Sequence, residues 1–330
     1  MKFIFTALIF LASQLIIAQN KSGYKVSKTF HIPSAGGWDY ILADGGKLYV
    51  SHGTQVNILD QKTGDSLGYI PNTLGVHGIA INPDNGKGYT SNGRLNTITV
   101  FNVKTMDTTR QIPVGQNPDA IMYEPFTKKI ITCNGRSNNL SIVDPVKEAE
   151  IATVALEGKP ETAVSDGMGK LYVNIEDKSK IAVVDLKTNQ VIASWPLSPG
   201  EGPTGLAFDV RGRRLFAGCD KQLIVMNADN GSIVAKVPIG NGCDGVAFDN
   251  SLRLVFASCG EGVLSIVHEI SADNYSLVEN LPTKRSARTI GIDERNHEVF
   301  LPAADMQPPA AQGERPRMVP GTFQILVVSK

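Results

Sequence analysis

A five-residue pattern of hydrophobic and small side chains, which begins with a charged residue in six of its copies, recurs seven times in this 330-residue chain. Successive copies begin 40 to 44 residues apart. A period of this length indicates an array of similar structural units, each of which buries its core against its neighbours. The copies are Lys47–Ser51, Lys87–Ser91, Lys129–Cys133, Lys170–Asn174, Arg214–Gly218, Leu254–Ser258 and Glu298–Pro302.

Each repeat contains four short segments rich in β-branched and aromatic residues. In the second repeat these segments are Gly78–Ile81, Lys87–Ser91, Thr97–Phe101 and Thr108–Val114, and turns rich in Asn, Asp, Gly and Pro separate them. Such a pattern predicts four antiparallel strands. Four strands in about forty residues are typical of a propeller blade, so we predict an all-β, seven-bladed β-propeller.

The two ends of the chain predict how the ring closes. The seventh repeat has three predicted strands, near Thr289–Ile292, Glu298–Leu301 and Gln324–Val328. Tyr24–Ile32 reads as a strand that has no blade of its own. We expect this N-terminal strand to complete the last blade, which would leave no open edge in a single domain over residues 19–330.

The first 18 residues read as a secretory signal peptide. Lys2 precedes an apolar run that ends at Ala18, a small residue suited to cleavage. The alternative is that this segment stays uncleaved as a membrane anchor. No cysteine lies near the cut, so we do not expect a lipid anchor. We therefore expect an exported protein, periplasmic or secreted, with no membrane span after cleavage because no later segment approaches the ~20 apolar residues needed.

The overall composition narrows the class of protein. Lys+Arg 32 equals Asp+Glu 32, so the chain lacks the charge excess expected of a non-specific nucleic-acid binder. A hydrophobic fraction of 42% provides a substantial core and excludes disorder as the main state. Gly 32 and Pro 18 supply the many turns that a propeller needs.

The repeats resemble those of the YVTN-type, YncE-like seven-bladed propellers. The resemblance is carried by Asn117–Ile121, Gly202–Leu206, Lys170–Val173, Ser141–Asp144 and Ala182–Asp185, and it covers essentially the whole mature chain. It implies the fold and an exported protein, but each element is a packing or turn device that does not specify an activity. One group of this family is reported to bind DNA; we do not expect that here, because no basic, aromatic-interleaved surface is evident.

Propeller topology places the start of each innermost strand at one mouth of the central channel. Reading one position per repeat gives a predicted ring of mouth residues, six of which are ionisable. They are Asp39, His77, Asp119, Glu161, Thr204, Asp244 and Arg288.

These mouth residues allow three interpretations. They could cap strand ends and face channel water, with Arg288 offsetting several acids. They could hold Ca²⁺ or Mg²⁺, or Zn²⁺ if the imidazole coordinates, with His77, Asp119, Glu161 and Asp244 as ligands. They could also perform acid–base chemistry, because crowded carboxylates raise one another's pKa. The resemblance extends to lactonases and lyases that have a similar propeller shape. None of their local motifs matches this sequence well enough to identify a catalytic residue.

Two further features fall on the same predicted face. Arg94 and Arg136 follow Asn-Gly turns in adjacent repeats and could present guanidinium groups to an anionic or sugar ligand. A Pro-rich insertion, Ala303–Gly321, separates the second and third strands of the last repeat, and we expect either a partial cover over the mouth or a loop without function.

Four cysteines, Cys133, Cys219, Cys243 and Cys259, have no zinc-ribbon spacing. The hairpin geometry predicts that Cys243 and Cys259 lie side by side, so an exported protein could join Cys243 to Cys259 or to Cys219. The alternative is a group of free thiols near Asp244 that binds a soft metal.

Two function classes remain open at this stage. The first is a monomeric binding module whose mouth face recognises a small molecule, a glycan or a protein. The alternative is a metal-assisted, lactonase-like hydrolase or lyase that uses the mouth carboxylates and His77. An enzyme would require strongly shifted pKa values in a pocket, whereas a binding module requires only shape and exposed groups.

Overall fold

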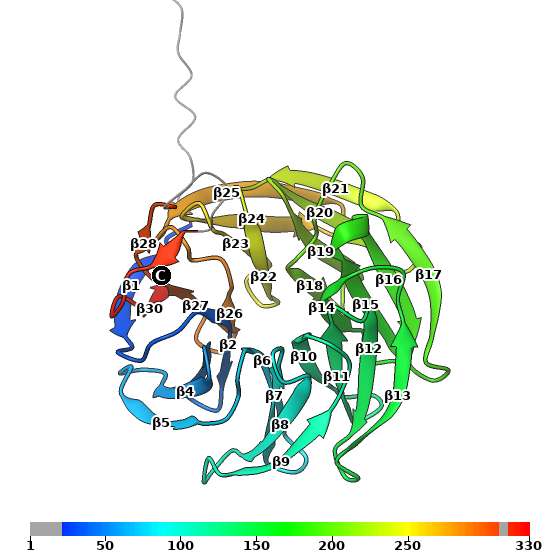
Figure 1. The fold of residues 1–330 in the computed structure, drawn as a ribbon. Coiled ribbons are helices and arrows are strands. Elements are labelled where there is room, and N and C mark those ends of the chain that lie inside the picture. The colour runs from blue at the N-terminus through cyan, green and yellow to red at the C-terminus, as the bar shows by residue number, and fades with distance from the viewer. Residues whose placement is uncertain (1–21, 310–315) are drawn as a thin grey trace, which may run out of the picture.

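Seven four-stranded antiparallel sheets form a ring around a central channel (Figure 1). This computed structural model describes residues 22–309 and 316–330. It confirms the predicted all-β, seven-bladed propeller. The predicted signal peptide, Met1–Ala18, lies outside the described residues.

Each blade contributes one strand to each of four concentric positions, and blades are numbered here from β2 onward. The innermost strands are β2 (Trp38–Asp44), β6 (Val76–Asn82), β10 (Pro118–Glu124), β14 (Pro160–Ser165), β18 (Leu206–Asp209), β22 (Cys243–Asp249) and β26 (Gly291–Asp293). The second strands are β3 (Lys47–His52), β7 (Lys87–Asn92), β11 (Lys129–Asn134), β15 (Lys170–Ile175), β19 (Arg214–Cys219), β23 (Leu254–Cys259) and β27 (Glu298–Ala303).

The third and outer strands complete the sheets. The third strands are β4 (Gln55–Asp60), β8 (Thr97–Asn102), β12 (Asn139–Asp144), β16 (Lys180–Asp185), β20 (Gln222–Asn227), β24 (Val263–Ser271) and β30 (Gln324–Ser329). The outer strands are β5 (Ser66–Ile70), β9 (Thr108–Pro113), β13 (Ala149–Ala155), β17 (Gln190–Pro196), β21 (Ile233–Pro238), β25 (Asn274–Pro282) and β1 (Lys25–His31).

Strand β1 closes the ring as predicted. It pairs antiparallel with β30, so the last blade has the order β1-β30-β27-β26. Phe30 of β1 is 7% exposed and packs in one core with Ile41 and Leu48 of blade 1. The closing strand therefore joins the last blade to the first through buried apolar contacts as well as through its hydrogen bonds.

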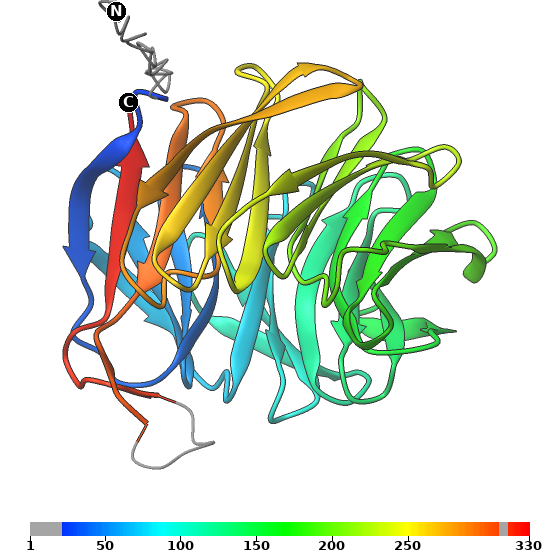
Figure 2. The same ribbon diagram turned by 90° about the horizontal axis from the view of Figure 1, so that it is seen from above.

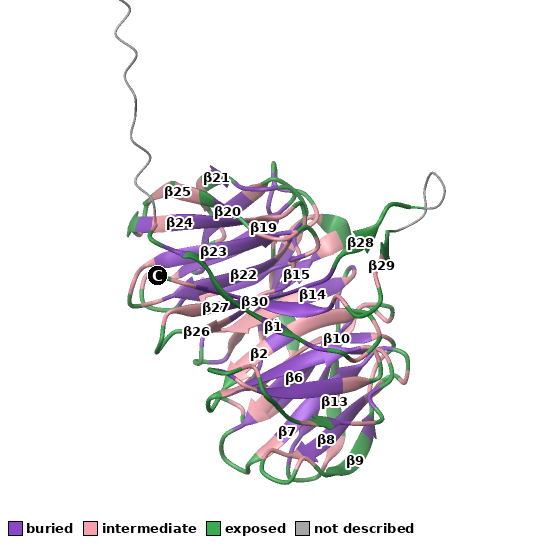
Figure 3. Cartoon of the chain, turned by 90° about the vertical axis from the view of Figure 1, so that its left-hand side faces the viewer, coloured by how far each residue is buried: buried purple, intermediate pink, exposed green. Residues whose placement is uncertain are grey.

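The core lies between adjacent blades, in the second and third strands (Figure 3). Tyr49, Tyr89 and Tyr172, which recur in the repeated pattern, are fully buried. Outer strands such as β9 and β17 are largely exposed. The repeated pattern is thus chiefly a packing device, because the second strand of each blade is covered on both faces.

The insertion of the last blade forms a small hairpin of β28 (Met306–Gln307) and β29 (Arg317–Met318). Figure 2 shows this hairpin leaving one face of the ring, whereas the C-terminus lies at the opposite face. A 3-10 helix, Glu176–Lys178, follows β15. Within the described residues, no helix is long and apolar enough to cross a membrane.

Candidate functional site

β-bulges open the innermost strands of the first four blades. In blade 1, Trp38 pairs with His52 and Ile41 with Val50, so the two residues between them face the single residue Ser51. A bulge re-aims the side chain of its extra residue. The first bulge residue in blades 1 to 4 is a predicted mouth residue in every case: Asp39, His77, Asp119 and Glu161.

Three of these side chains, from three successive blades, meet in one cluster. His77 Nδ1 lies 2.6 Å from Asp39 Oδ2 and 3.8 Å from Asp119 Oδ1. We call Asp39, His77 and Asp119 the His77 cluster. One nitrogen or oxygen atom from each residue lies within 4.8 Å of the other two.

The remaining acids of the mouth are paired with cations. Arg288 forms an ion pair with Asp244, and its Nη2 lies 3.5 Å from Asp39 Oδ1. Lys159 Nζ lies 2.5 Å from Glu161 Oε1 and is also paired with Glu176. Two of the four predicted metal ligands, His77 and Asp119, therefore lie close together, and Asp39 is the third residue of their cluster. The other two are paired with cations: Asp244 with the guanidinium group of Arg288 and Glu161 with the ammonium group of Lys159.

Burial dominates the electrostatics of the mouth. It raises the pKa of Asp119 to about 6, with the charge of Asp39 adding to the effect and His77 opposing it. Burial and the neighbouring Asp119 raise the pKa of Glu161 to about 8, because Lys159 compensates only in part. Burial alone would lower the pKa of His77, but the hydrogen bond to Asp39 and the nearby carboxylates raise it overall. The buried carboxyl groups of Asp119 and Glu161 therefore hold their protons to a higher pH than free side chains do.

Three other predicted ligand-binding residues lie outside the His77 cluster. The hydroxyl of Thr204 donates to the backbone carbonyl of Cys243 at 2.7 Å, which connects blade 5 to blade 6. Arg94 and Arg136 are exposed in the turns that follow β7 and β11. Neither of these two arginines forms an ion pair with any residue that the structure describes.

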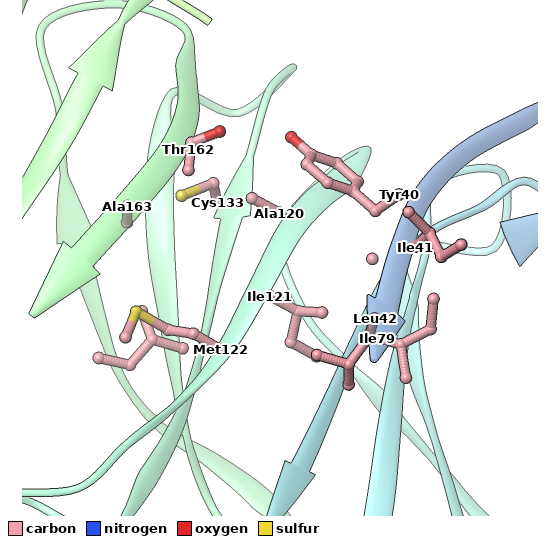
Figure 4. A pocket seen from close by; sticks show the side chains of 12 residues that line it. Tyr40, Ile41, Leu42, Ile79, Ala120, Ile121, Met122, Cys133, Thr162 and Ala163 are labelled. Atoms are coloured by element: carbon pink, nitrogen blue, oxygen red, sulfur yellow. The ribbon is translucent and has the colours of Figure 1, made fainter. Parts of the chain in front are cut away.

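A cavity of about 150 Å³ is lined by the innermost strands that carry the His77 cluster (Figure 4). Tyr40, Gly78 and Ala120, which line it, directly follow the three cluster residues in sequence. In Figure 4 the Tyr40 side chain points across the cavity toward Thr162 and Cys133. Most of the lining is aliphatic, and each cluster residue directly precedes a residue that lines this apolar space.

A larger pocket of about 1070 Å³ separates the insertion hairpin from the mouth. Basic residues from both sides line it: Lys284, Arg285, Arg288 and Arg317. Figure 3 shows the hairpin projecting from one face of the ring, and its described part forms a wall of the pocket.

Several residues of these sites were absent from the sequence prediction. Lys159 directly precedes β14, Glu176 begins the 3-10 helix after β15, and Arg285 and Arg317 lie 32 positions apart in sequence. Lys159 could have been found, because it comes two residues before Glu161 at the strand entry. Arg285 and Arg317 could not have been found from the sequence, because only the folded insertion brings them to one pocket.

The cysteines are buried away from solvent. Cys243 and Cys259 are directly opposite in the register of β22 and β23, which confirms the predicted proximity. All four thiols are free, so the predicted disulfide is not present. The thiols of Cys243 and Cys259 instead donate to carbonyls of their own strands.

Comparison with known proteins supports the fold but identifies no function. The chain is a seven-bladed β-propeller, and 1740 chains of known structure match it. One is titled "Kuenenia stuttgartiensis Hydrazine Synthase", with a TM-score of 0.73 and 15% identity over 82% of this chain and 94% of that chain. No family model and no curated protein matches the sequence. A shape shared so widely does not identify an activity, so function has to be argued from the site.

Proposed function

We propose that this protein is an exported, YncE-like binding propeller that holds a small anionic molecule in the pocket between the insertion hairpin and the channel mouth. The proposal rests on one observation, the convergence of basic side chains on that pocket. Lys284, Arg285 and Arg288 come from the loop before β26, and Arg317 comes from the hairpin. A negatively charged group at their centre would reduce their mutual repulsion.

The existing ion pairs leave part of this positive charge available. Lys284 Nζ is 2.6 Å from Asp305 Oδ1, and Arg288 is engaged with Asp244 and Asp39. Arg285 and Arg317 are exposed and form no ion pair among the described residues. Planar guanidinium groups match carboxylates and phosphates through paired hydrogen bonds.

The pocket also offers surfaces suited to a sugar ring. Met306, Pro308 and Pro309 line it from the hairpin, and Trp38 lines it from blade 1. Its volume of about 1070 Å³ is at the upper end of small-molecule sites, which leaves room for a whole sugar ring. We therefore favour an acidic sugar or a similar organic anion over a protein partner, and we propose that the propeller acts as a monomer.

Calorimetric titration with galacturonate and with neutral galactose tests the proposal. We expect galacturonate alone to bind, and Arg285→Ala and Arg317→Ala each to weaken binding about tenfold through the loss of a charge-assisted hydrogen bond. Arg211→Ala is the matched control, because Arg211 is exposed in the turn between β18 and β19, away from the pocket.

Two outcomes would overturn the pocket assignment. Equal binding of galactose and galacturonate would show that charge does not decide recognition. Unchanged binding in both pocket variants would place the ligand elsewhere on the mouth face.

The second candidate is a metal-assisted hydrolase or lyase of lactonase-like type. It is favoured by the His77 cluster, in which an imidazole and two carboxylates meet, and by the raised pKa of Asp119. Turnover of a simple lactone that disappears in His77→Ala, while galacturonate still binds, would select this alternative.

A further inference from the structure

We propose that Asp39, His77 and Asp119 bind one divalent first-row transition-metal ion of the zinc or manganese kind. This inference goes beyond ligand binding in the basic pocket and does not depend on it. The three residues come from different blades, so the site would join blades 1, 2 and 3 at the mouth of the channel.

The observed distances between donor atoms lie on either side of the spacing that a metal ion requires. His77 Nδ1 lies 2.6 Å from Asp39 Oδ2 and 3.8 Å from Asp119 Oδ1. An ion with bonds of about 2.0–2.2 Å to nitrogen and oxygen holds neighbouring ligand atoms about 3–3.5 Å apart. Only small side-chain adjustments separate the observed cluster from a coordinated one.

Asp119 supplies a second, independent indication. The residue is 9% exposed, and its carboxylate accepts no hydrogen bond from the described residues. Its nearest cationic partner is His77 Nδ1 at 3.8 Å, inside the cluster. The carboxylate side chain is 13% exposed, so it is mostly removed from water with only a distant imidazole as partner, and a bound cation would offset the cost of that desolvation.

The imidazole is held so that Nδ1 faces both carboxylates. Its Nε2 is packed against Gly93, where an added Cβ would come within 2.6 Å of that nitrogen. The backbone N–H of the next residue, Gly78, donates to Ser91 Oγ at 2.8 Å. The protein therefore fixes the ligand orientation before any metal arrives, which is a requirement of tight sites.

The donor set favours one class of ion. One imidazole nitrogen and two carboxylate oxygens suit zinc or manganese, whereas calcium takes six to eight oxygen ligands. Three protein ligands also leave at least one coordination position open, as in zinc sites that bind water or substrate.

Calorimetric titration of tag-free, chelator-treated protein with ZnCl₂, MnCl₂ and CaCl₂ tests the site. We expect one zinc or manganese ion per chain, with calcium at least tenfold weaker. His77→Ala and Asp119→Asn should each weaken binding by at least about tenfold, since even residues that only support a ligand contribute that much. Asp119→Asn keeps the side-chain shape and removes a buried charge, so it tests the site in a protein that folds.

The chain provides a matched control in His297→Ala. His297 Nδ1 also lies 2.6 Å from a buried carboxylate, Asp249 Oδ2, but that pair lacks a third donor. This variant should bind metal like the wild type. Absence of stoichiometric zinc and manganese binding, or wild-type affinity in His77→Ala, would overturn the proposal. Zinc binding without galacturonate binding would uphold this site and reject the anion pocket; the reverse result would do the opposite.

Discussion

The hydroxyl of Ser91 donates a hydrogen bond to the backbone carbonyl of Asp119 in the neighbouring blade. The same oxygen accepts the N–H of Gly78, so one side chain fixes the backbone beside both His77 and Asp119. Ser51 has a related role in blade 1, where its oxygen accepts the N–H of Asp39 at 2.9 Å. A serine of the repeated pattern thus supports the strand entries that carry the His77 cluster.

Ser91→Ala should destabilise the protein by about 1–2 kcal/mol, because it leaves a buried donor and a buried acceptor without their partner. Urea denaturation measures the change, and zinc titration of the same variant should show weaker binding. Ser194→Ala, in the exposed outer strand β17, is the control and should have little effect. Equal stability of the two variants would contradict the role of Ser91.

The closing strand gives a second prediction. Phe30 is 7% exposed and packs against Gly64 in blade 1, a position with no room for a side chain. Phe30→Ala should lower the free energy of unfolding by about 3–5 kcal/mol, as for other buried phenylalanines. Phe126→Ala, at a residue that is 43% exposed, should cost far less. A small effect at Phe30 would mean that main-chain pairing alone closes the ring.

The sequence predicted the ring and the closing strand because each follows from a period and a topology. It did not predict which mouth residues meet. Asp39 joins His77 because bulges aim both side chains into the channel, while Glu161 is drawn to Lys159 and Asp244 to Arg288. The pairings of Asp39 with His77 and of Asp244 with Arg288 depend on distances between blades, about which a single repeat contains no information, whereas Lys159 and Glu161 lie in the same repeat.

One departure from the repeated pattern has a packing explanation that can be tested. Gly88 of β7 pairs directly with Phe101 of β8, whereas blade 1 has Leu48 opposite Leu59. The Phe101 ring fills the space that a side chain at position 88 would need. Gly88→Leu alone should therefore overpack the core and destabilise the fold by about 1–3 kcal/mol or more.

The double variant Gly88→Leu with Phe101→Leu should recover most of that loss, because it reproduces the pair found in blade 1. Thermal unfolding of both variants and of Phe101→Leu gives the coupling between the two positions. Simple additivity would show that the two side chains do not share one space.

The raised pKa of Glu161 predicts a dependence of stability on pH. Its pKa is about 8 in the folded protein and 4.5 for an ordinary glutamate, because burial outweighs the pairing with Lys159. The folded state therefore binds the proton more tightly, and this contribution to stability is complete below pH 4.5 and is lost as the pH rises through about 8.

Glutamine mimics the protonated side chain at every pH. Glu161→Gln should thus match the wild type near pH 4.5 and gain an advantage of about 1 kcal/mol per pH unit up to pH 8. Urea midpoints between pH 5 and 9, in the presence of chelator, measure this difference. Glu201→Gln, at an exposed residue, should show a difference that does not change with pH. If the Glu161→Gln advantage is also constant, Glu161 is ionised throughout this range and Lys159 compensates fully for its burial.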